Sequence, residues 1–424
     1  MHEAHQPLQD VRVLELAQIM AGPTCGLMLA DLGADVVKVE RFPGGDDARG
    51  FKGAAPGTED GLPPGFMILN RGKRSVALDL KRPEGIAALH RLVMEADVLT
   101  ENFRPGTMER LGIGYEDLRR INPRLIFCSV TGYGGQGPLV GRGGFDLILQ
   151  AFAGLISVTG EPGRRPVKPG VSIADINAGI LAAFGIMAAY IHRLRTGEGQ
   201  RVETSLLQAA MQQTYWFAAA WFATGAVPGP MGTAHPLVAP YETFPCADGE
   251  LAIGGANESN WRRLAELLGH PEWLDDPRFQ SSGERLANRD VLSELIGGVT
   301  RARSRAEWEV LLVDAGIPVG PVQTIGEALD HPQAAAVGMV TDVGHPSGGT
   351  MRALGFPINL DSRNIAADRP PPRLGEHTAE VLAEAGLTEL EISELLRCRA
   401  AFAPSPPSGT AGAHAQEVAM TSKE

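Results

Sequence analysis

The sequence has few cysteines, and their spacing is unsuited to a metal centre. Its 424 residues include four cysteines, which lie far apart and form no C-x-x-C pair: Cys25, Cys128, Cys246 and Cys398. This pattern argues against a structural zinc site and against a disulfide framework, so no metal ligand is predicted. Widely spaced thiols fit a reducing compartment, and we expect the protein to be cytoplasmic.

The sequence also lacks an excess of positive charge. Its 38 lysines and arginines face 50 acidic residues, for a net charge of −12. This balance argues against nucleic acid or an anionic membrane as a partner, although a local basic pocket is compatible with it. The N-terminal stretch MHEAHQPLQD has no signal-peptide core. The apolar run over residues 176–194 is close to the minimum spanning length; we interpret it as a core helix, with a membrane helix as the less favoured alternative.

Several catalytic signatures are missing. There is no H-E-x-x-H, no G-x-S-x-G and no Walker lysine. The loop AQIMAG, where a dinucleotide-binding turn would be expected, is not a G-x-G-x-x-G, which removes most support for a nicotinamide cofactor. The glycine-rich TGYGGQGP lacks the lysine and hydroxyl of a P-loop. Side-chain chemistry remains, and a carboxylate nucleophile is one of few options.

The first half of the chain alternates between strand and helix patterns. Such alternation predicts an α/β fold with a parallel sheet. The predicted strands cover residues 11–16, 35–40, 75–80, 97–101, 124–130 and 200–203, and the predicted helices cover residues 23–32, 83–96, 107–122, 146–158, 176–194 and 205–224. The last helix is rich in aromatic residues, which predicts core or subunit interface.

The second half has a different texture. A D-G turn between two apolar stretches predicts a hairpin near residues 243–255, followed by three helices near residues 260–269, 288–302 and 304–315. Ser304 and Glu307 form a capping-box pattern. A second hairpin is predicted over residues 338–354, with helices near 378–385 and 388–398. The segment 403–424 is poor in large apolar residues and is expected to be a disordered tail.

Asp175 stands immediately before the apolar helix, after a β-like run over residues 171–174. On local pattern, an ordinary helix N-cap is the favoured interpretation, because aspartate is a preferred cap. The functional alternative is a nucleophile held near backbone donors that stabilise a developing oxyanion. Basic residues also follow several predicted strands, at the edge where α/β sheets bind ligands, but each alone is more often a solvated surface charge.

Taken together, many ordered motifs resemble the class III CoA-transferases, the formyl-CoA transferase and carnitine CoA-transferase group. The motifs extend from Leu8 to about Leu396 and include LELAQIMAGPTCGLMLADLGADVVKVER, NRGKRSVALDLKRPEG, ADVLTENFRPGTMERLG, FCSVTGYGGQGP, VSIADINAG, RTGEGQRVETSLLQA and RLGEHT. The segments PMGTAHPLVAPYETFPCADG and ADRPPPRLGEHT are most similar to the branch that includes succinate–hydroxymethylglutarate CoA-transferase and uses dicarboxylic acids.

The resemblance implies a fold, an assembly and a nucleophile. The expected large Rossmann-like α/β domain combines N- and C-terminal segments, and two protomers interlock as a homodimer. On this basis we expect a large domain over residues 1–225, a linker over 226–240, a small α+β domain over 241–330 and a return segment over 331–402 that completes the large domain. Asp175 matches the family's catalytic aspartate.

The resemblance also implies ligand contacts. Seven positions match the family's coenzyme A contacts: Arg41, Leu78, Lys81, Asn102, Arg104, Arg110 and Arg142. The loop that covers the active site corresponds to residues 232–236, with Gly232, Thr233 and His235 near the substrate. The thioester is a substrate, and no permanently bound cofactor is expected. Formyl-CoA transferases have a glutamine where this chain has Met20, which disfavours oxalate or formate.

The expected reaction moves CoA from an acyl-CoA, with succinyl-CoA as the favoured donor, to a dicarboxylic acid through a covalent aspartyl intermediate. A second carboxylate needs a cationic or donor-rich partner, for which the candidates are Arg164, Arg165, Lys168 and His235. Three alternatives remain open. One is a transferase for monocarboxylic or carnitine-like acids, and another is a non-catalytic CoA-binding protein. The third is an acyl-CoA racemase, disfavoured because Phe145 replaces the histidine base of similar racemases.

Overall fold

The computed structural model describes residues 6–51, 62–361 and 363–404. Contacts divide the chain into two compact units, one from residues 1–149, 172–209 and 337–424 and the other from residues 150–171 and 210–336. The second unit therefore takes in residues 150–171 and 210–225, which the sequence analysis assigned to the large domain. A main-chain hydrogen bond of 2.9 Å from Gly232 to Gly160 ties two of its segments together. The predicted tail lies outside the described residues from residue 405 onward.

The first unit contains a seven-stranded sheet in the order β14-β3-β2-β1-β4-β5-β6. Every pair of neighbours is parallel except β14 and β3, which are antiparallel. The predicted α/β fold is confirmed. The strands are β1 (Arg12–Glu15), β2 (Asp35–Arg41), β3 (Lys73–Leu78), β4 (Val98–Glu101), β5 (Ile126–Thr131), β6 (Arg201–Ser205) and β14 (Ala401–Phe402).

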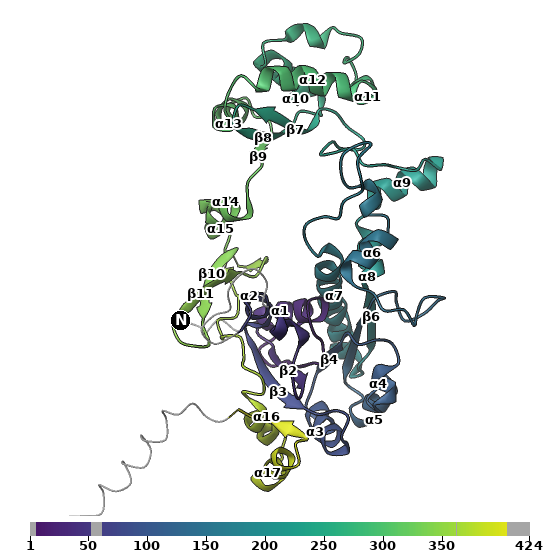
Figure 1. Cartoon of the computed structure of the whole chain (residues 1–424), viewed down its shortest axis with the longest axis vertical. Helices are drawn as coiled ribbons and strands as arrows, with labels where there is room; N and C mark the ends of the chain where they lie inside the picture. The colour runs from purple at the N-terminus through teal and green to yellow at the C-terminus, as the bar shows by residue number, and fades with distance from the viewer. Residues whose placement is uncertain (1–5, 52–61, 362, 405–424) are drawn as a thin grey trace, which may run out of the picture. The chain divides into compact units, whose positions relative to one another are not determined.

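Helices cover both faces of this sheet. Leu14, Val37 and Val76, from three neighbouring strands, lie on one face of the sheet. They pack there with α3 (Pro83–Met94), α5 (Tyr115–Ile121), α16 (Thr378–Glu384) and α17 (Glu389–Arg397). Figure 1 shows α16 and α17, in yellow, beside α3. The opposite face carries α1 (Ala21–Asp31) and α7 (Ile173–Thr196). Shorter helices are α2 (Pro64–Asn70), α4 (Thr107–Arg110), α6 (Asp146–Phe152) and α8 (Leu206–Gln212).

The helix α7 packs through its small residues. Ala174, Ala178, Gly179 and Ala182 are buried. An added Cβ at Gly179 would lie 2.5 Å from the carbonyl oxygen of Ala21, so only glycine permits this approach of α7 to α1. Among the described helices, α7 is the one that is long and apolar enough to cross a membrane, but its small-residue face is committed to packing within the α/β unit.

The interpretation of residues 176–194 as a core helix is wrong for the side of the helix that faces away from α1. A stripe of large apolar side chains at helical spacing is exposed along α7: Ile176, Ile180, Phe184, Ile191 and Leu194, with Phe184 74% exposed. These side chains point away from the small residues that contact α1, because residues four apart share one face of a helix. The prediction of a β-like run over residues 171–174 is also wrong, since the helix begins at Ile173.

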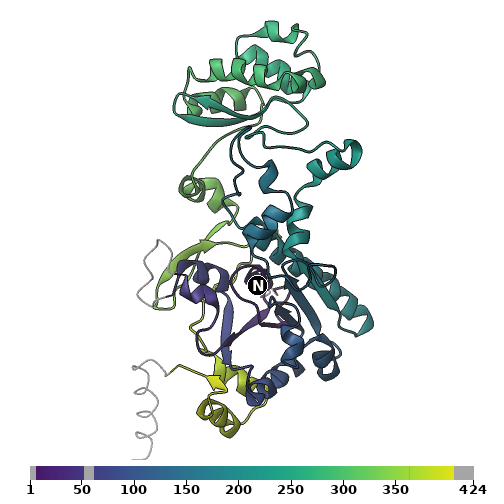
Figure 2. The same cartoon turned by 45° about the vertical axis from the view of Figure 1, so that its right-hand side comes forward.

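The C-terminal part of the chain returns to the first unit. The predicted hairpin is confirmed as β10 (Val340–Gly344) and β11 (Thr350–Leu354), and β12 (Asn359–Leu360) pairs with β13 (Arg363–Asn364). Met351 packs against the cluster around Phe66, and Figure 2 shows the green hairpin beside the purple N-terminal helices. The predicted final helices, α16 and α17, are also confirmed.

The second unit has its own small sheet and core. The predicted hairpin is confirmed as β7 (Tyr241–Cys246) and β8 (Gly249–Gly254), to which β9 (Val319–Pro321) adds an antiparallel strand. The predicted helices are α10 (Glu258–Leu267), α12 (Arg289–Thr300) and α13 (Arg305–Asp314), the last with its Ser304 capping box. The sequence analysis did not predict β9, α11 (Ser282–Ala287), α14 (Ile325–Asp330) or α15 (Pro332–Ala336).

The predicted aromatic helix is interrupted. Residues 213–214 separate α8 from α9 (Tyr215–Thr224). Among the aromatic residues of α9, Tyr215 is 68% exposed and Phe222 is 83% exposed, and no residue of this helix is buried. The aromatic side chains therefore do not form core. A subunit interface stays a prediction for them.

Candidate active site

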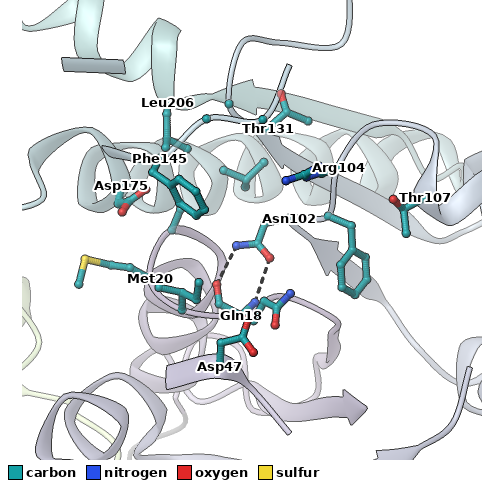
Figure 3. A pocket seen from close by; sticks show the side chains of 17 residues that line it. Gln18, Met20, Asp47, Asn102, Arg104, Thr107, Thr131, Phe145, Asp175 and Leu206 are labelled. Carbon is teal, nitrogen blue, oxygen red and sulfur yellow. Dashed lines mark hydrogen bonds between the residues drawn. The ribbon is translucent and has the colours of Figure 1, made fainter. Parts of the chain in front are cut away.

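A cavity of about 380 Å³ opens in the first unit at the carboxyl end of the sheet. This edge is where parallel α/β sheets place ligands. Figure 3 shows Asp175, Phe145 and Met20 close together on one side of the cavity and Asn102 and Arg104 on another. The wall also contains Gln18, Ile19, Ala21, Asp47, Phe103, Thr107, Thr131, Gly132, Gly144 and Leu206.

Asp175 occupies the first turn of α7 but does not cap it. The N-cap residue is Ser172, whose side chain makes no cap hydrogen bond, so the predicted N-cap role of Asp175 is wrong. The N–H of Ala174 instead donates to Asp146 Oδ1 at 3.0 Å. The carboxylate of Asp175 itself lines the cavity.

The environment of Asp175 makes its carboxyl group unusually basic. Burial, together with like-charge repulsion from the nearby carboxylate of Asp146, raises the pKa of Asp175 to about 6. Asp146 itself is 8% exposed. A carboxylate of this kind is ionised at neutral pH and is a stronger nucleophile than one with the ordinary pKa.

A second cavity of about 730 Å³ adjoins the first at Gln18, Phe103 and Thr107, which line both. It brings together four of the predicted CoA contacts, namely Arg41, Leu78, Lys81 and Arg110. Two more, Asn102 and Arg104, line the cavity of Asp175. The seventh, Arg142, is exposed in the loop after β5 and lines neither cavity.

Local hydrogen bonds order the boundary between the two cavities. Asn102 accepts from the N–H of Gln18 at 2.9 Å and donates to the carbonyl oxygen of Gln18 at 2.8 Å, which fixes this loop against the end of β4. Arg110 donates to Thr107 at 2.9 Å. Arg41 forms an exposed ion pair with Asp47, so this guanidinium is partly neutralised.

The predicted substrate loop belongs to the second unit, whereas Asp175 belongs to the first. The loop is anchored to β7. Thr233 Oγ1 accepts from the N–H of Thr243 at 3.0 Å, and the N–H of His235 donates to the carbonyl oxygen of Tyr241 at 3.0 Å. Gly232 has a φ of 64°, which suits glycine. Three candidate cations, Arg164, Arg165 and Lys168, are also in the second unit.

Sequence reasoning missed two groups that shape the site. Asp146 stands two residues after the glycine pair of RGGFD, and Asp46 directly follows that of FPGGDD; a preceding glycine pair was the one local signal. Neither position has a motif that reveals its distant partner. Within the described residues, no group of three or more histidine, cysteine or acidic side chains is arranged to hold a metal ion.

The fold and the cavity define an α/β protein with a basic carboxylate at the ligand-binding edge of its sheet, beside a cavity lined by cationic side chains. Residues 8–378 match the family model described as CoA-transferase family III. The chain belongs to CoA-transferase family III and is a transferase enzyme.

Several curated relatives act on CoA esters of dicarboxylic acids. A succinate–glutarate CoA-transferase of Agrobacterium fabrum is 39% identical over 381 residues, which cover 89% of this chain and 95% of that one. A succinyl-CoA:mesaconate CoA-transferase of Haloarcula hispanica is 39% identical, with 90% of this chain and 96% of the relative covered. The human succinyl-CoA:glutarate CoA-transferase is 33% identical over 89% of this chain and 86% of its own length.

Solved structures show the same fold. A CAIB/BAIF family protein from Brucella suis is similar with a TM-score of 0.79 and 40% identity, over 90% of this chain and 99% of that one. The protein Rv3272 from Mycobacterium tuberculosis is similar with a TM-score of 0.78 and 32% identity, over 88% of this chain and 98% of its own.

The raised pKa of Asp175 predicts a pH-dependent stability difference. A carboxyl group with a higher pKa in the folded state than in the unfolded state destabilises the fold once it ionises. Asp175→Asn should therefore raise Tm relative to the wild type above pH 6, and this gain should disappear as the pH falls from about 6 towards 4. Thermal unfolding from pH 4 to pH 8 measures the difference.

The matched variant is Asp146→Asn, which keeps an oxygen for the N–H of Ala174 but removes the like charge. In this background the gain from Asp175→Asn should shrink, and its decline on acidification should begin at a lower pH, because the folded-state pKa of Asp175 is lower without the like charge. A pH-independent gain in both backgrounds would contradict the assigned pKa shift.

Proposed function

We propose that this transferase moves CoA from succinyl-CoA to a second dicarboxylic acid through covalent intermediates on Asp175. The observation that carries the proposal is the carboxylate of Asp175, directed into the cavity with its pKa raised to about 6. The relatives named for succinate or succinyl-CoA and for glutarate or mesaconate support the substrate class.

The proposed reaction has four acyl-transfer steps, which pass through a mixed anhydride, an aspartyl-CoA thioester and a second anhydride. An oxygen of Asp175 attacks the succinyl thioester carbon, the C–S bond breaks, and CoA thiolate leaves a mixed anhydride. The thiolate then attacks the aspartyl carbonyl carbon and releases succinate, which leaves an aspartyl-CoA thioester. The acceptor carboxylate attacks that thioester to form a second anhydride, and the thiolate takes the acceptor acyl group and restores Asp175. One thioester replaces another, so little net energy is needed.

The two adjoining cavities support separate binding positions for the two ends of CoA. Arg41, Lys81 and Arg110 line the larger one and provide charge for phosphate groups. The shared wall at Gln18, Phe103 and Thr107 leads into the cavity of Asp175. We therefore place the nucleotide end of CoA in the larger cavity and the thioester beside Asp175. Arg142 is the weakest of the proposed contacts, because it lines neither cavity.

The wall near Asp175 supports transfer over racemisation. Phe145 lines the same cavity as Asp175, and phenylalanine has no group that can accept or donate a proton. A racemase needs a second acid–base group opposite the first, whereas the transfer needs one carboxylate nucleophile. Met20 and Phe145 add apolar surface that fits the methylene chain of a succinyl or glutaryl group.

We also propose that the functional assembly is an interlocked homodimer. The stripe of exposed side chains on α7, from Ile176 to Leu194, is a continuous apolar surface of the kind that marks a protein interface. In the second unit, α9 exposes Tyr215, Trp216 and Phe222, and aromatic residues are enriched at interfaces. Burial of these surfaces against a second copy would remove both from water.

The first test of function concerns the nucleophile. Asp175→Ala should abolish thioester exchange and leave CoA binding within a few-fold of the wild type, because the CoA contacts remain. Hydroxylamine added during turnover should convert the acylated Asp175 of the wild type to a hydroxamate, identified by peptide mass spectrometry. Exchange at the wild-type rate by the alanine variant would exclude Asp175 as the nucleophile.

The second test concerns the acceptor. With succinyl-CoA as donor, dicarboxylates of four to six carbons should form new CoA thioesters, detected by mass spectrometry. Monocarboxylates of equal length should have kcat/KM values lower by roughly 10²-fold, on the scale of a lost charge-assisted hydrogen bond. Arg164→Ala, Arg165→Ala, Lys168→Ala and His235→Ala should identify the cation that binds the second carboxylate. Pentanoate or carnitine as efficient as glutarate would contradict the dicarboxylate proposal but not the transferase class.

The third test concerns assembly. Light scattering at micromolar concentration should give twice the chain mass of 45.0 kDa, without dissociation on dilution, because interlocked chains must partly unfold to separate. Phe184→Glu should lower the yield or Tm of the dimer, since it places a charge in the proposed apolar interface. Leu390→Glu is a matched control, as Leu390 is similarly exposed, on α17, outside both surfaces. A monomeric wild type would rule the dimer out.

A further inference from the structure

Ile19 holds an unfavourable backbone conformation in the wall of the active-site cavity. Its φ is 69°, in the left-handed region that β-branched residues rarely adopt. Of the described residues other than glycine, Asp361 and Arg399 are the two others with positive φ. Ile19 differs from them because it lines the cavity that contains Asp175. A strained residue in such a position persists only when its surroundings hold it.

Two side chains from other segments hold the loop around Ile19. The N–H of Ile19 donates to Asp46 Oδ1 at 2.9 Å. In the same peptide unit, the carbonyl oxygen of Gln18 accepts from Asn102 Nδ2, and the N–H of Gln18, in the preceding unit, donates to Asn102 Oδ1. The loop between β1 and α1 is therefore fixed by the segment after β2 and by the end of β4, and its own sequence does not determine its shape.

Asp46 is itself held by a buried cation. Lys38 Nζ lies 2.8 Å from Asp46 Oδ2, and both side chains are almost completely inaccessible. The same ammonium group donates to the carbonyl oxygen of Ala17 at 2.8 Å. Lys38 thus connects the residue before the strained loop with the carboxylate that holds Ile19.

The charge state of this pair is well defined. Burial opposes ionisation of Lys38, but the carboxylates of Glu15 and Asp46 overcome it and raise the pKa of Lys38 above its ordinary value. Burial likewise opposes ionisation of Asp46, yet Lys38 and the N–H groups of Ala48 and Ile19 lower the pKa of Asp46. Both groups are therefore charged at neutral pH, so the contact is an ion pair rather than a neutral hydrogen bond.

Ile19 immediately precedes the N-cap of α1 in the wall of the cavity. Met20, at the N-cap of α1, makes no side-chain cap hydrogen bond, and the cavity is lined by Ile19, Met20 and Ala21 in succession. The first N–H groups of a helix have no partner within the helix and stabilise nearby negative charge. Negative charge develops on the carbonyl oxygen during each acyl exchange of the proposed mechanism.

We propose that Asp46 and Lys38 are positioning residues that keep Ile19 in its left-handed conformation and thereby hold the start of α1 against the acyl group on Asp175. The pair contacts no reacting atom in this scheme. It acts through the backbone of residues 18–21. The inference rests on the proposed function, since it assigns the pair a role in acyl exchange on Asp175.

A double-mutant cycle tests this linkage. Glycine adopts positive φ readily, so Ile19→Gly reduces the need for an external group to hold the backbone. Asp46→Ala should lower kcat for thioester exchange by about 10-fold or more in the wild-type background, with KM for succinyl-CoA changed less than about 3-fold. In the Ile19→Gly background, the same substitution should lower kcat by about 3-fold or less.

A matched control separates positioning from stability. Asp31 is fully buried and forms an ion pair with Arg71, including a 2.9 Å contact from Nη2, at the far end of α1 from the cavity. Asp31→Asn should lower Tm without lowering kcat per folded molecule, which circular dichroism normalises. If Asp46→Ala does not fold, Asp46→Asn replaces it, because asparagine keeps an acceptor for Ile19 but loses the charge that pairs with Lys38.

The possible outcomes are distinct. A smaller loss of kcat in the Ile19→Gly background supports the linkage. Equal losses in both backgrounds, or an effect on Tm alone, would overturn it. If the wild-type chain exchanges no thioesters, the proposed function fails; if it does exchange them and the two losses are equal, only the positioning role of Asp46 and Lys38 fails.

Discussion

The carboxylate of Glu15 is the buried charge around which the first unit is assembled. It is inaccessible to solvent and lies 2.8 Å from both Lys38 Nζ and Lys73 Nζ, so it joins β1 to β2 and β3. An added Cβ at Gly26 would lie 1.7 Å from Glu15 Oε2, which means that α1 crosses directly over this carboxylate. Burial lowers the pKa of Lys73 to about 8, whereas Lys38 stays firmly charged because it also pairs with Asp46. A buried charge without a partner would be very costly, so these elements are specified together.

At Asp175 the charge next to the buried carboxylate has the same sign instead of the opposite sign. There the structure places two carboxylates near each other at the start of α7 and supplies the Ala174 N–H to one of them, Asp146. Asp175 receives burial and repulsion, and its pKa rises to about 6. Such an arrangement weakens the fold slightly, and groups of this kind are concentrated at functional sites. The unit thus neutralises the charges beneath α1 and leaves one charge poorly compensated at the cavity.

The helix α7 has three separate roles in the structure. Its alanines and Gly179 permit close packing on α1, its first turn carries Asp175, and its outer stripe exposes Ile180 and Phe184. A helix apolar on all sides is normally enclosed on all sides. Here one side is enclosed by the unit itself, and the proposed second copy would enclose the other, which would link assembly of the dimer directly to the helix that carries the nucleophile.

Hydrophobic periodicity and turn residues were sufficient to predict the strands β1 to β6 along the chain, the hairpins at β7–β8 and β10–β11, and the Ser304 cap. Each of these depends on residues within a few positions of one another. The resemblance to known motifs, rather than local pattern, singled out Asp175. Local pattern was wrong about its place in the helix, since α7 begins at Ile173 with Ser172 as its N-cap. The acceptor for the N–H of Ala174 is Asp146, from a distant segment. The sequence also could not predict the exposed face of α7 or the ion pair between Lys38 and Asp46. Composition does not reveal which side of an apolar helix packs on the core or which buried charges pair. Those pairings arise only when β1, β2 and the start of α1 come together in three dimensions.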